Sequence, residues 1–441
     1  MPDRALPRGS GLAAGLLIVA AGIAAPQSVP EPRSGEGAPV VFWQRLGDTT
    51  LARLTAEALQ ANRDVHLAQA RVRQARAARS NAALDLFPTV SVAGGYTRQR
   101  IPAAAYGTAV PGRGLWDGEL RASWELDLFG RVRRNLRAQG ALVESADHEV
   151  RDMQRVLSAE LAAAYFDLRG AQDQLLVARR NAENQRRTLE LTRNRLEAGR
   201  GTAFDTERAQ AQLSTTLASV PTFEARIAAA RHRIGVLVGR DPASLGNELT
   251  ELPAGPSDQP CPWPGMPEVP EEIIAGDVDS LIRSRPDVRA AERRLAAETA
   301  FVGAARADYL PRLRVGGTAG FTSTDFDGFG RSGSGRYAIG PVITWPAFNL
   351  GRVKAGVDAA KALEAEARAR HEQTVLLARE EVRTALVAYA KARERLAQLA
   401  EAAGASSRAA ELARIRFEGG VADFFEVLDA ERVLLAAQDQ L

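Results

Sequence analysis

Two long segments of the chain carry an apolar or small residue at every seventh position. The first runs from Arg131 to Glu197 without a proline, and as one helix it would be roughly 100 Å long, far above the usual length. A helix packed in one globular core would explain this stripe of apolar and small residues, but not the length of the helix. The sustained heptad therefore predicts coiled-coil-like packing between neighbouring helices. The heptad positions are Leu161, Leu168, Leu175, Ala182, Leu189 and Leu196, then Val375, Val382, Tyr389, Leu396, Ala403, Ala410 and Phe417.

Shorter stretches alternate apolar and polar residues at every second position. Period two with one charged face predicts a sheet that is apolar on one side and polar on the other. Transmembrane barrel strands have this pattern, and so do the strands of a soluble sandwich. Loops between paired strands are predicted at 97–118 and 322–336. The apolar positions are Leu120, Ala122, Trp124, Leu126, Leu128, Leu313, Val315, Tyr337, Ile339, Ile343 and Trp345.

The order of these elements occurs twice. The sequence NRDVHLAQARVRQARAARSNAALDLFP, from Asn62, matches RPDVRAAERRLAAETAFVGAARADYLP, from Arg285. Further on, DLFGRVRR matches NLGRVKAG and RLEAG matches RFEGG, each about 221 residues later, which indicates a tandem duplication. Each repeat reads helix, strand, loop, strand, long helix, short turn and helix. The predicted boundaries are 45–251 for the first repeat, 252–272 for a linker rich in proline and glycine, and 273–441 for the second repeat.

The second repeat is expected to lack part of its last helix. After the first turn the helical pattern continues from Phe204 to about Val238, whereas after the second turn the chain ends at Leu441. Repeat symmetry puts the difference at about 15 to 20 residues, so a truncated sequence and a shorter helix are both open.

A proline stands at each transition from a helical to an alternating segment. Pro88 follows the first helical segment of repeat one, and Pro311 holds the same place in repeat two. Proline has no N–H for a helix and disfavours helical geometry in the residue before it. Gly130 and Gly351 mark the return from strand to long helix. These four residues are the predicted helix-to-strand junctions.

The N-terminus has the pattern of a secretory signal peptide. Arg4 and Arg8 precede an apolar run from Gly11 to Ala25, and small residues stand near a plausible cleavage site at Ala24. The predicted signal peptide is therefore 1–24, with a retained anchor helix as the alternative. No later stretch reaches the apolar length of a transmembrane helix, so a membrane-embedded mature chain would have to use β-strands. Four strands cannot close a barrel alone, so either they form a small soluble sheet or several chains share one barrel.

Composition excludes several classes of function. Lys and Arg total 57 and Asp and Glu total 54, giving a net charge of +3 with the two signs interleaved, which does not indicate a nucleic-acid surface. Cys261 is the only cysteine, so no intrachain disulfide is possible. The four histidines are scattered, and no metal site or cofactor is expected. No nucleophile-elbow, phosphate-loop or metal motif occurs, so the chain is not expected to be an enzyme.

Several stretches together resemble the TolC-like outer-membrane efflux channels, and most closely the outer-membrane factors of multidrug pumps of the resistance-nodulation-division type. These are SRPDVRAAERRLAAETAFVGAARADYLPRLRVGG, SWELDLFGRVRR, RLEAGRGTAFDTERAQAQL and RFEGGVADFFEVLDAERVLL. The resemblance implies a homotrimer in the outer membrane of a Gram-negative bacterium. Each chain would give four strands to a 12-stranded transmembrane β-barrel, and long coiled-coil-like helices would cross the periplasm. The implied partners are membrane lipid, a periplasmic adaptor and an inner-membrane transporter. The implied function is passive conduction of drugs and toxic compounds to the exterior.

The two helix–helix turns carry residues typical of helix caps. Gly199 and Gly420 suit C-terminal caps. Thr202 and Asp423 match in the repeat and suit N-caps. An acid stands three residues after each of them, which predicts capping boxes. The resemblance places both turns at the periplasmic tip.

The resemblance also implies that acids at the tip form a gate. An acid at the position of Asp205 would hold the tip shut, and acids at Glu426 and Asp429 would form rings that narrow the aperture. Helix capping alone would also explain the acids of the two turns. Some relatives carry an arginine where this chain has Ala422, so the closed state is expected to use other partners, with Arg200 and Arg416 as the candidates. The aromatic position beside the turn is occupied by Phe417, which lacks a hydroxyl.

Three alternatives stay open. A channel for type I protein secretion or heavy-metal efflux would share the fold. A secreted structural or adaptor protein built on a long coiled coil would share only the helices. Relatives often carry a lipobox cysteine after the signal peptide, and none stands near Ala24, so no acylation is expected.

Overall fold

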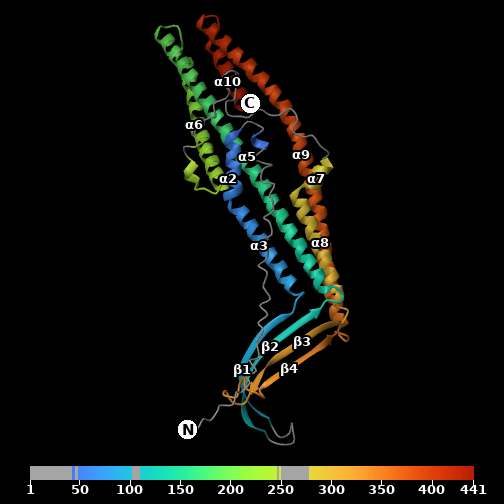
Figure 1. Ribbon diagram of the computed structural model, residues 1–441. Helices are drawn as coiled ribbons and strands as arrows, with labels where there is room; N and C mark the ends of the chain where they lie inside the picture. The colour runs from blue at the N-terminus through green and yellow to red at the C-terminus, as the bar shows by residue number, and fades with distance from the viewer. Residues whose placement is uncertain (1–41, 45–47, 102–109, 246–247, 250–277) are drawn as a thin grey trace, which may run out of the picture.

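The computed structural model describes residues 42–44, 48–101, 110–245, 248–249 and 278–441. The predicted signal peptide 1–24, its cleavage site and the linker 252–272 lie outside these residues. Figure 1 shows an elongated molecule in which long helices run from a sheet at one end to two helical tips at the other.

Helices make up most of the described chain. The predicted helix from Arg131 to Glu197 is confirmed with those bounds, and its repeat counterpart is of similar length. Among the described residues, no helix is long and apolar enough to cross a membrane. In the first half the helices are α2 (Thr49–Ala61), α3 (Arg63–Leu84), α5 (Arg131–Glu197), α6 (Ala203–Leu237) and the 3-10 helix η1 (Pro242–Leu245). In the second half they are α7 (Val278–Ser284), α8 (Pro286–Ala307), α9 (Leu350–Glu418) and α10 (Phe424–Gln440).

The two long helices bury their heptad positions to different extents. In α5, Leu161 and Leu168 are fully buried in a core shared with α2, α3 and α6. In α9, the first heptad positions are only partly buried and Leu396 is 48% exposed. The α9 stripe is therefore only partly covered up to Leu396, whereas Ala403, Ala410 and Phe417 toward the tip are buried, as is most of the α5 stripe.

Four antiparallel strands form one sheet in the order β1–β2–β3–β4. Their bounds are β1 (Thr89–Ile101), β2 (Val110–Leu126), β3 (Arg312–Ser323) and β4 (Gly335–Thr344). The loop predicted at 97–118 is wrong over most of its length, because β1 and β2 extend into it and pair as far as Ile101 and Val110. Pairing between β1 and β2 satisfies the backbone hydrogen-bonding groups of this segment, although it contains several glycines. The second predicted loop is correct apart from its ends.

The sheet has one apolar and one polar face, as the alternation predicts. On the apolar face large side chains are exposed, including Val92 at 80%, Ile339 at 79% and Tyr337 at 85%. The polar face carries acids and arginines that pair across strands. An exposed apolar face of this size marks a surface that is covered by something other than water.

The transitions from helix to strand are built alike in the two repeats. Pro88 and Pro311 each lie directly before a strand. The indole N–H of Trp124 donates to the carbonyl of Leu86 at 2.9 Å, and that of Trp345 donates to the carbonyl of Tyr309 at 3.0 Å. Each tryptophan thus joins the strand that leaves the sheet to the turn that enters it.

The return from strand to helix differs between the repeats. Gly130 has φ of 76° and precedes α5, so a side chain there would be strained. Asp127 accepts from the backbone N–H groups of Val132 and Arg133 and occupies the positive end of α5. Gly351 instead lies in the first turn of α9 and has an ordinary helical backbone.

Candidate functional site

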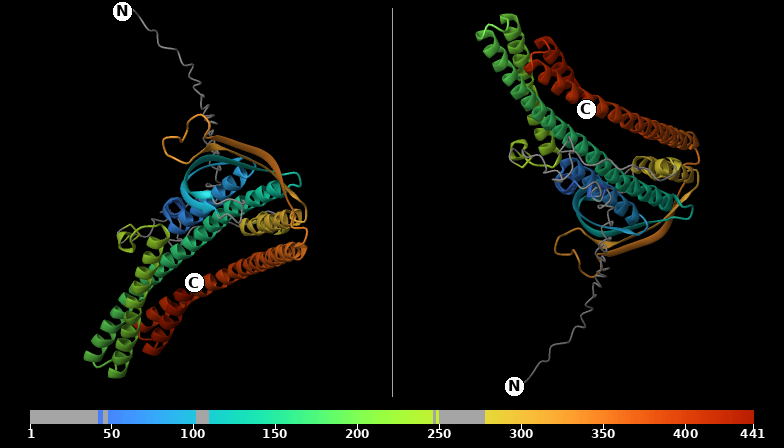
Figure 2. Two further views of the ribbon diagram at one scale, coloured as in Figure 1. Left: turned by 90° about the horizontal axis from the view of Figure 1, so that it is seen from below. Right: turned by 90° about the horizontal axis from the view of Figure 1, so that it is seen from above.

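The two helical hairpins end side by side at one end of the molecule, in turns of the same geometry (Figures 1 and 2). Gly199 and Gly420 have φ of 71° and 73°, which only glycine adopts without strain. The N–H of Arg200 donates to the carbonyl of Arg195, and the N–H of Val421 donates to that of Arg416. Both helices therefore end in a Schellman motif.

Thr202 and Asp423 are the N-caps of α6 and α10. The Thr202 hydroxyl accepts from the N–H of Asp205 at 3.2 Å, and the Asp423 carboxylate accepts from the N–H of Glu426 at 3.0 Å. The second hydrogen bond of each predicted capping box, from the backbone N–H of the N-cap residue to the acid three residues later, does not form. The Asp205 carboxylate accepts from the Thr202 hydroxyl at 2.6 Å, and the Glu426 carboxylate turns to an arginine instead.

The three acids predicted at the gate have different partners in the single chain. Glu426 pairs with Arg416 at 3.0 Å, both on the second hairpin. Asp429 pairs with Arg432 at 2.8 Å on the surface of α10. The structure does not bring Asp205 to Arg416, and Arg200 is exposed with no ion pair to a described residue. Of the two candidate arginines, only Arg416 contacts a predicted gate acid.

Phe417 lies in the apolar core of the tip. It is 5% exposed, and its ring lies 5.7 Å from the ring of Phe424. Its apolar neighbours come from all four tip helices and include Leu189 of α5 and Leu213 of α6. In the single chain Phe417 is thus buried between the hairpins, which suits an aromatic ring without a hydroxyl, and its part in the gate stays a prediction.

Arg195 connects the two hairpins, and sequence reasoning did not assign it a role. Its guanidinium lies 3.9 Å from the centre of the Phe417 ring and donates to the Phe417 carbonyl at 2.6 Å. This places a cation at the C-terminal end of α9, where the helix dipole favours it. Arg195 and Arg416 occupy equivalent positions in the two repeats. The sequence therefore shows that the two arginines correspond, but not which helix each one contacts.

A polar contact lies one turn further from the tip. Glu431 of α10 is 7% exposed and accepts from Arg414 of its own hairpin and from Thr188 of α5, each at 3.2 Å. At the repeat-equivalent place in the first hairpin, Arg193 donates to Gln210 at 3.1 Å. Each hairpin therefore has the same internal contact, but only in the second hairpin does the α10 residue also bind a residue of the other hairpin.

The polar face of the sheet holds a network of charges. Glu119 is 7% exposed and pairs with Arg121 and with Arg336, the latter at 2.6 Å. Glu125 pairs with Arg131 at 2.9 Å and with Arg314 at 3.4 Å. Salt bridges therefore connect β2 to β3, to β4 and to the start of α5.

A cluster of buried polar groups lies on α5 around Asp173. Asp173 is 7% exposed, and burial raises the pKa of its carboxyl to about 6, against the opposing effect of nearby Arg169. Burial likewise raises the pKa of Tyr165 to about 12. Gln172 donates to the carbonyl of Leu249 at 2.7 Å. This cluster belongs to the core of the first repeat.

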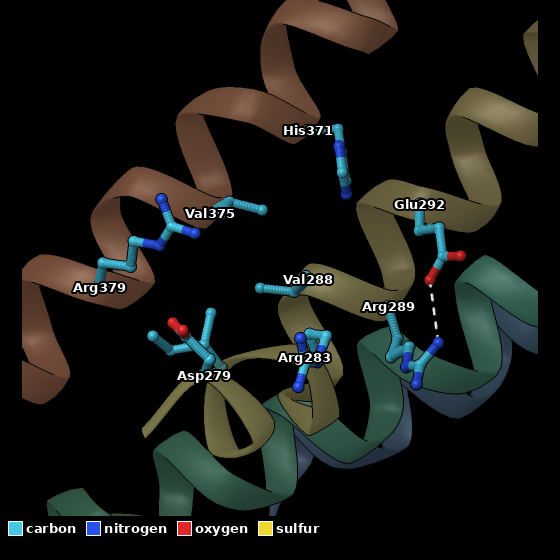
Figure 3. Close-up of a pocket in the computed structure, with 9 residues that line it drawn as sticks. Asp279, Arg283, Val288, Arg289, Glu292, His371, Val375 and Arg379 are labelled. Carbon is cyan, nitrogen blue, oxygen red and sulfur yellow. Dashed lines mark hydrogen bonds and ion pairs between the residues drawn. The ribbon is translucent and has the colours of Figure 1, made fainter. Parts of the chain in front are cut away.

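A cavity of about 370 Å³ lies between α7, α8 and α9 (Figure 3). Val288 and Val375 face each other across it, and His371 lies beside them. On its rim Arg289 pairs with Glu292 at 3.1 Å. The lining mixes apolar side chains with the acids Asp279 and Glu292 and with several basic groups. The predicted gate residues lie elsewhere, at the hairpin tip, which is therefore the candidate functional site.

Comparisons with known proteins agree with this architecture. The family model for outer membrane efflux proteins matches residues 54–240 and 278–441. The toluene efflux pump outer membrane protein TtgF of Pseudomonas putida is 32% identical over 395 residues, covering 89% of this chain and 79% of that protein. The outer membrane protein OprJ of Pseudomonas aeruginosa is 30% identical over 403 residues, covering 91% and 82% respectively.

A solved structure of the outer-membrane channel OprN superimposes with a TM-score of 0.84 at 40% identity, covering 91% of this chain and 87% of that chain. The match confirms the predicted fold class of long helices with a small sheet. The family match takes in both repeats and excludes the linker. The chain belongs to the outer membrane efflux protein family.

Proposed function

We propose that this protein is the outer-membrane channel of a tripartite efflux system and conducts small toxic molecules passively to the exterior. The observation that carries the proposal is the combination of helices about 100 Å long with a sheet whose apolar face is exposed. A globular protein would bury such an apolar face and would cover such long helices on all sides. Lipid would cover the apolar face, and the long helices would extend the conduit through the periplasm.

Three copies would complete the channel. The single chain contributes four strands, which cannot close on themselves, and a homotrimer would join them into a 12-stranded barrel. The polar face with Glu119 and Arg336 would then line the lumen. A periplasmic adaptor and an inner-membrane transporter of the resistance-nodulation-division type would deliver the cargo at the helical tip.

The cargo class follows from relatives alone. TtgF is named for toluene efflux. Apolar organic compounds are therefore the first class to test with this chain, and drugs the second. The channel has no chemistry to perform on them, so selectivity rests on the pump and on the width and charge of the conduit.

The acids of the tip are proposed to narrow the closed channel. Threefold symmetry would turn Glu426 and Asp429 into rings of negative charge, whose repulsion is offset by counterions or by arginines. Asp205 would stand close to them on the first hairpin. In the single chain Arg416 already neutralises Glu426.

The test is single-channel recording of the purified protein in planar bilayers. We expect a small, cation-selective conductance in the parent. Asp205→Ala and the double variant Glu426→Ala/Asp429→Ala are expected to raise the conductance or lower the cation selectivity. Glu372→Ala removes an exposed acid of α9 far from the tip, is the matched control and is expected to change neither.

Two results would contradict parts of the proposal. Absence of insertion and conductance, from protein that stays soluble without detergent, would favour a periplasmic coiled-coil protein. Conductance that is indifferent to the tip variants would keep the channel and reduce the three acids to structural roles at the helix starts.

A further inference from the structure

A hollow lined by four arginines lies on the helices close to the sheet. It has a volume of about 470 Å³ and lies between α3, α5 and α8, which run toward the sheet in Figure 1. Glu144 is the only acid among its lining residues, and Gly140 forms part of its wall. The four arginines are Arg79 of α3, Arg133 and Arg137 of α5, and Arg293 of α8.

These arginines carry more charge than the nearby acids neutralise. Arg293 pairs with Glu144 at 3.4 Å, and Arg133 pairs with Asp127 at 3.1 Å. The other two arginines are exposed, and neither forms an ion pair with a residue in the described ranges. Four guanidinium groups against two carboxylates leave two positive charges, and such a surplus in a hollow attracts an anion.

The second repeat lacks this arrangement. The position equivalent to Arg79 holds the buried Val302. The position equivalent to Arg137 holds Asp358, which pairs with Lys361 at 3.6 Å. Because the second repeat joins its helices to the sheet without these arginines, the joint itself does not require them.

Gly140 leaves room beside the two unpaired arginines. Glycine inside a helix is less stable than alanine, so its presence in α5 calls for a reason. A Cβ at this position would meet only the Nε of Arg79, at 3.8 Å, which is an ordinary contact. Packing within the chain therefore does not explain the glycine, whereas space for a ligand next to Arg79 does.

The hollow opens away from the polar face of the sheet. Arg131, at the start of α5, pairs with Glu125 of that polar face at 2.9 Å. With 3.6 residues per turn, Arg133 and Gly140 lie about half a turn around the helix from Arg131. If the polar face lines the lumen, as proposed above, the hollow opens on the outer side, where lipid covers the sheet.

The hollow also lies at the height of lipid headgroups. Trp124 and Trp345 stand at the helix end of the sheet, and such aromatic residues mark the edge of the hydrocarbon layer. Arg133 and Arg137 lie within about 10 Å of the start of α5. The headgroup layer is about 5–8 Å thick on each side of a bilayer. Long arginine side chains can therefore place their guanidinium groups among the phosphates.

We propose that this hollow binds the phosphate of an anionic phospholipid in the periplasmic leaflet of the outer membrane, an inference that rests on the channel of the proposed function. Arg79 and Arg137, which lack counter-charges, donate to the phosphate oxygens, for which the planar guanidinium fork is suited. Gly140 makes room for the headgroup between them. The bound lipid fixes the height of the long helices at the membrane surface.

Calorimetric titration of the full-length protein in an uncharged detergent tests the site without requiring conductance. The probe is dihexanoyl phosphatidylglycerol below its critical micelle concentration, and inorganic phosphate is titrated separately. We expect one probe molecule to bind per chain, and inorganic phosphate to bind about tenfold more weakly because it lacks the glycerol and ester contacts. Equal affinity for inorganic phosphate would indicate a site for free anions and overturn the lipid assignment. Absence of binding would overturn the site.

Variants locate the binding in the hollow. Arg79→Ala/Arg137→Ala is expected to weaken binding of the probe about a hundredfold, or tenfold for each charge-assisted hydrogen bond. Arg180→Ala/Arg408→Ala removes two exposed arginines closer to the tip and is expected to bind as the parent does. An equal loss in both double variants would mean that general surface charge attracts the probe, and the site would be wrong.

Gly140→Leu keeps all four arginines and fills the space beside them. It is expected to weaken binding of the probe about tenfold, and unchanged binding would show that the headgroup does not enter the hollow. The channel and the lipid site can fail separately. Conductance without binding of the probe would overturn the lipid site alone. Binding that depends on Arg79 and Arg137, in protein without conductance, would support the site and count against the channel.

Discussion

Among the single residues, Asp173 has the clearest dependence on pH. Its carboxyl lies 7% exposed on α5, and burial raises its pKa to about 6, above its value in an unfolded chain. Between pH 4 and 6 the folded state therefore holds more protons than the unfolded state. The contribution of Asp173 to stability is largest below about pH 4 and is lost as the pH rises through about 6.

Asp173→Asn is therefore expected to stabilise the protein by about 1–2 kcal/mol at pH 7 and to have little effect at pH 4. The midpoint of thermal unfolding at the two pH values measures the difference. Asp167→Asn is the control, because Asp167 is half exposed and pairs with Arg226, so its loss costs less than about 1 kcal/mol. Destabilisation by Asp173→Asn at pH 7 would show that the charged carboxylate is the form that the core requires.

Residue-level prediction succeeded where backbone chemistry decides, and it left the surroundings of a side chain open where a neighbouring element decides them. Gly199, Gly420, Thr202 and Asp423 occupy the turn positions that their chemistry favours, and these positions are local in sequence. Phe417 could not be placed from sequence, because an aromatic residue on a heptad suits a buried core and a constriction equally. The same ambiguity hid the role of Arg195.

At the scale of elements, the long helices and the strand alternation could be predicted because each has a period of its own. The bounds of α5 follow from the absence of proline and the glycine at each end. The sheet register could not be predicted, and the extent of β1 and β2 was underestimated, because glycines in a strand resemble a loop in sequence. The indole hydrogen bonds of Trp124 and Trp345 were not predicted either, because the alternation shows only on which face of the sheet each ring lies.

These indole contacts give a prediction for the joints between helix and sheet. Trp124→Phe and Trp345→Phe each remove one hydrogen bond to a turn carbonyl and keep most of the ring, so each is expected to lower stability by about 1 kcal/mol. The joints lie in different repeats, so the double variant is expected to lose the sum. Thermal unfolding in detergent measures the losses. Trp116→Phe removes an indole that packs on Tyr96 and Phe326 without such a bond, and a loss as large there would contradict the role of the hydrogen bonds.

At the scale of the whole molecule, the polar face of the sheet sets the charge along the proposed lumen. Glu119 is buried between Arg121 and Arg336, so Glu119→Gln leaves two arginines partly uncompensated in each copy. We expect a shift of selectivity toward anions and a loss of stability of about 1–2 kcal/mol, reduced by the exposure of both arginines. The reversal potential in a salt gradient measures the selectivity.

Asp327→Asn is the matched control for this prediction. It makes the same change of charge in the exposed loop between β3 and β4. An equal shift of reversal potential in both variants would mean that the general surface charge, and not the network around Glu119, sets the selectivity.

The open order of the sheet has a consequence for how the protein reaches its membrane. Within the part of the chain that the structure describes, β1 and β4 are edge strands, so a single chain carries two rows of backbone N–H and C=O groups without a strand partner there. In hydrocarbon every such group costs several kcal/mol, which makes a lone inserted chain unstable. If the chain forms the proposed homotrimer, insertion and association would be one reaction of high kinetic order. A modest fall in the rate of synthesis would reduce the amount of mature protein far more than in proportion, leaving unassembled chains to periplasmic chaperones and proteases.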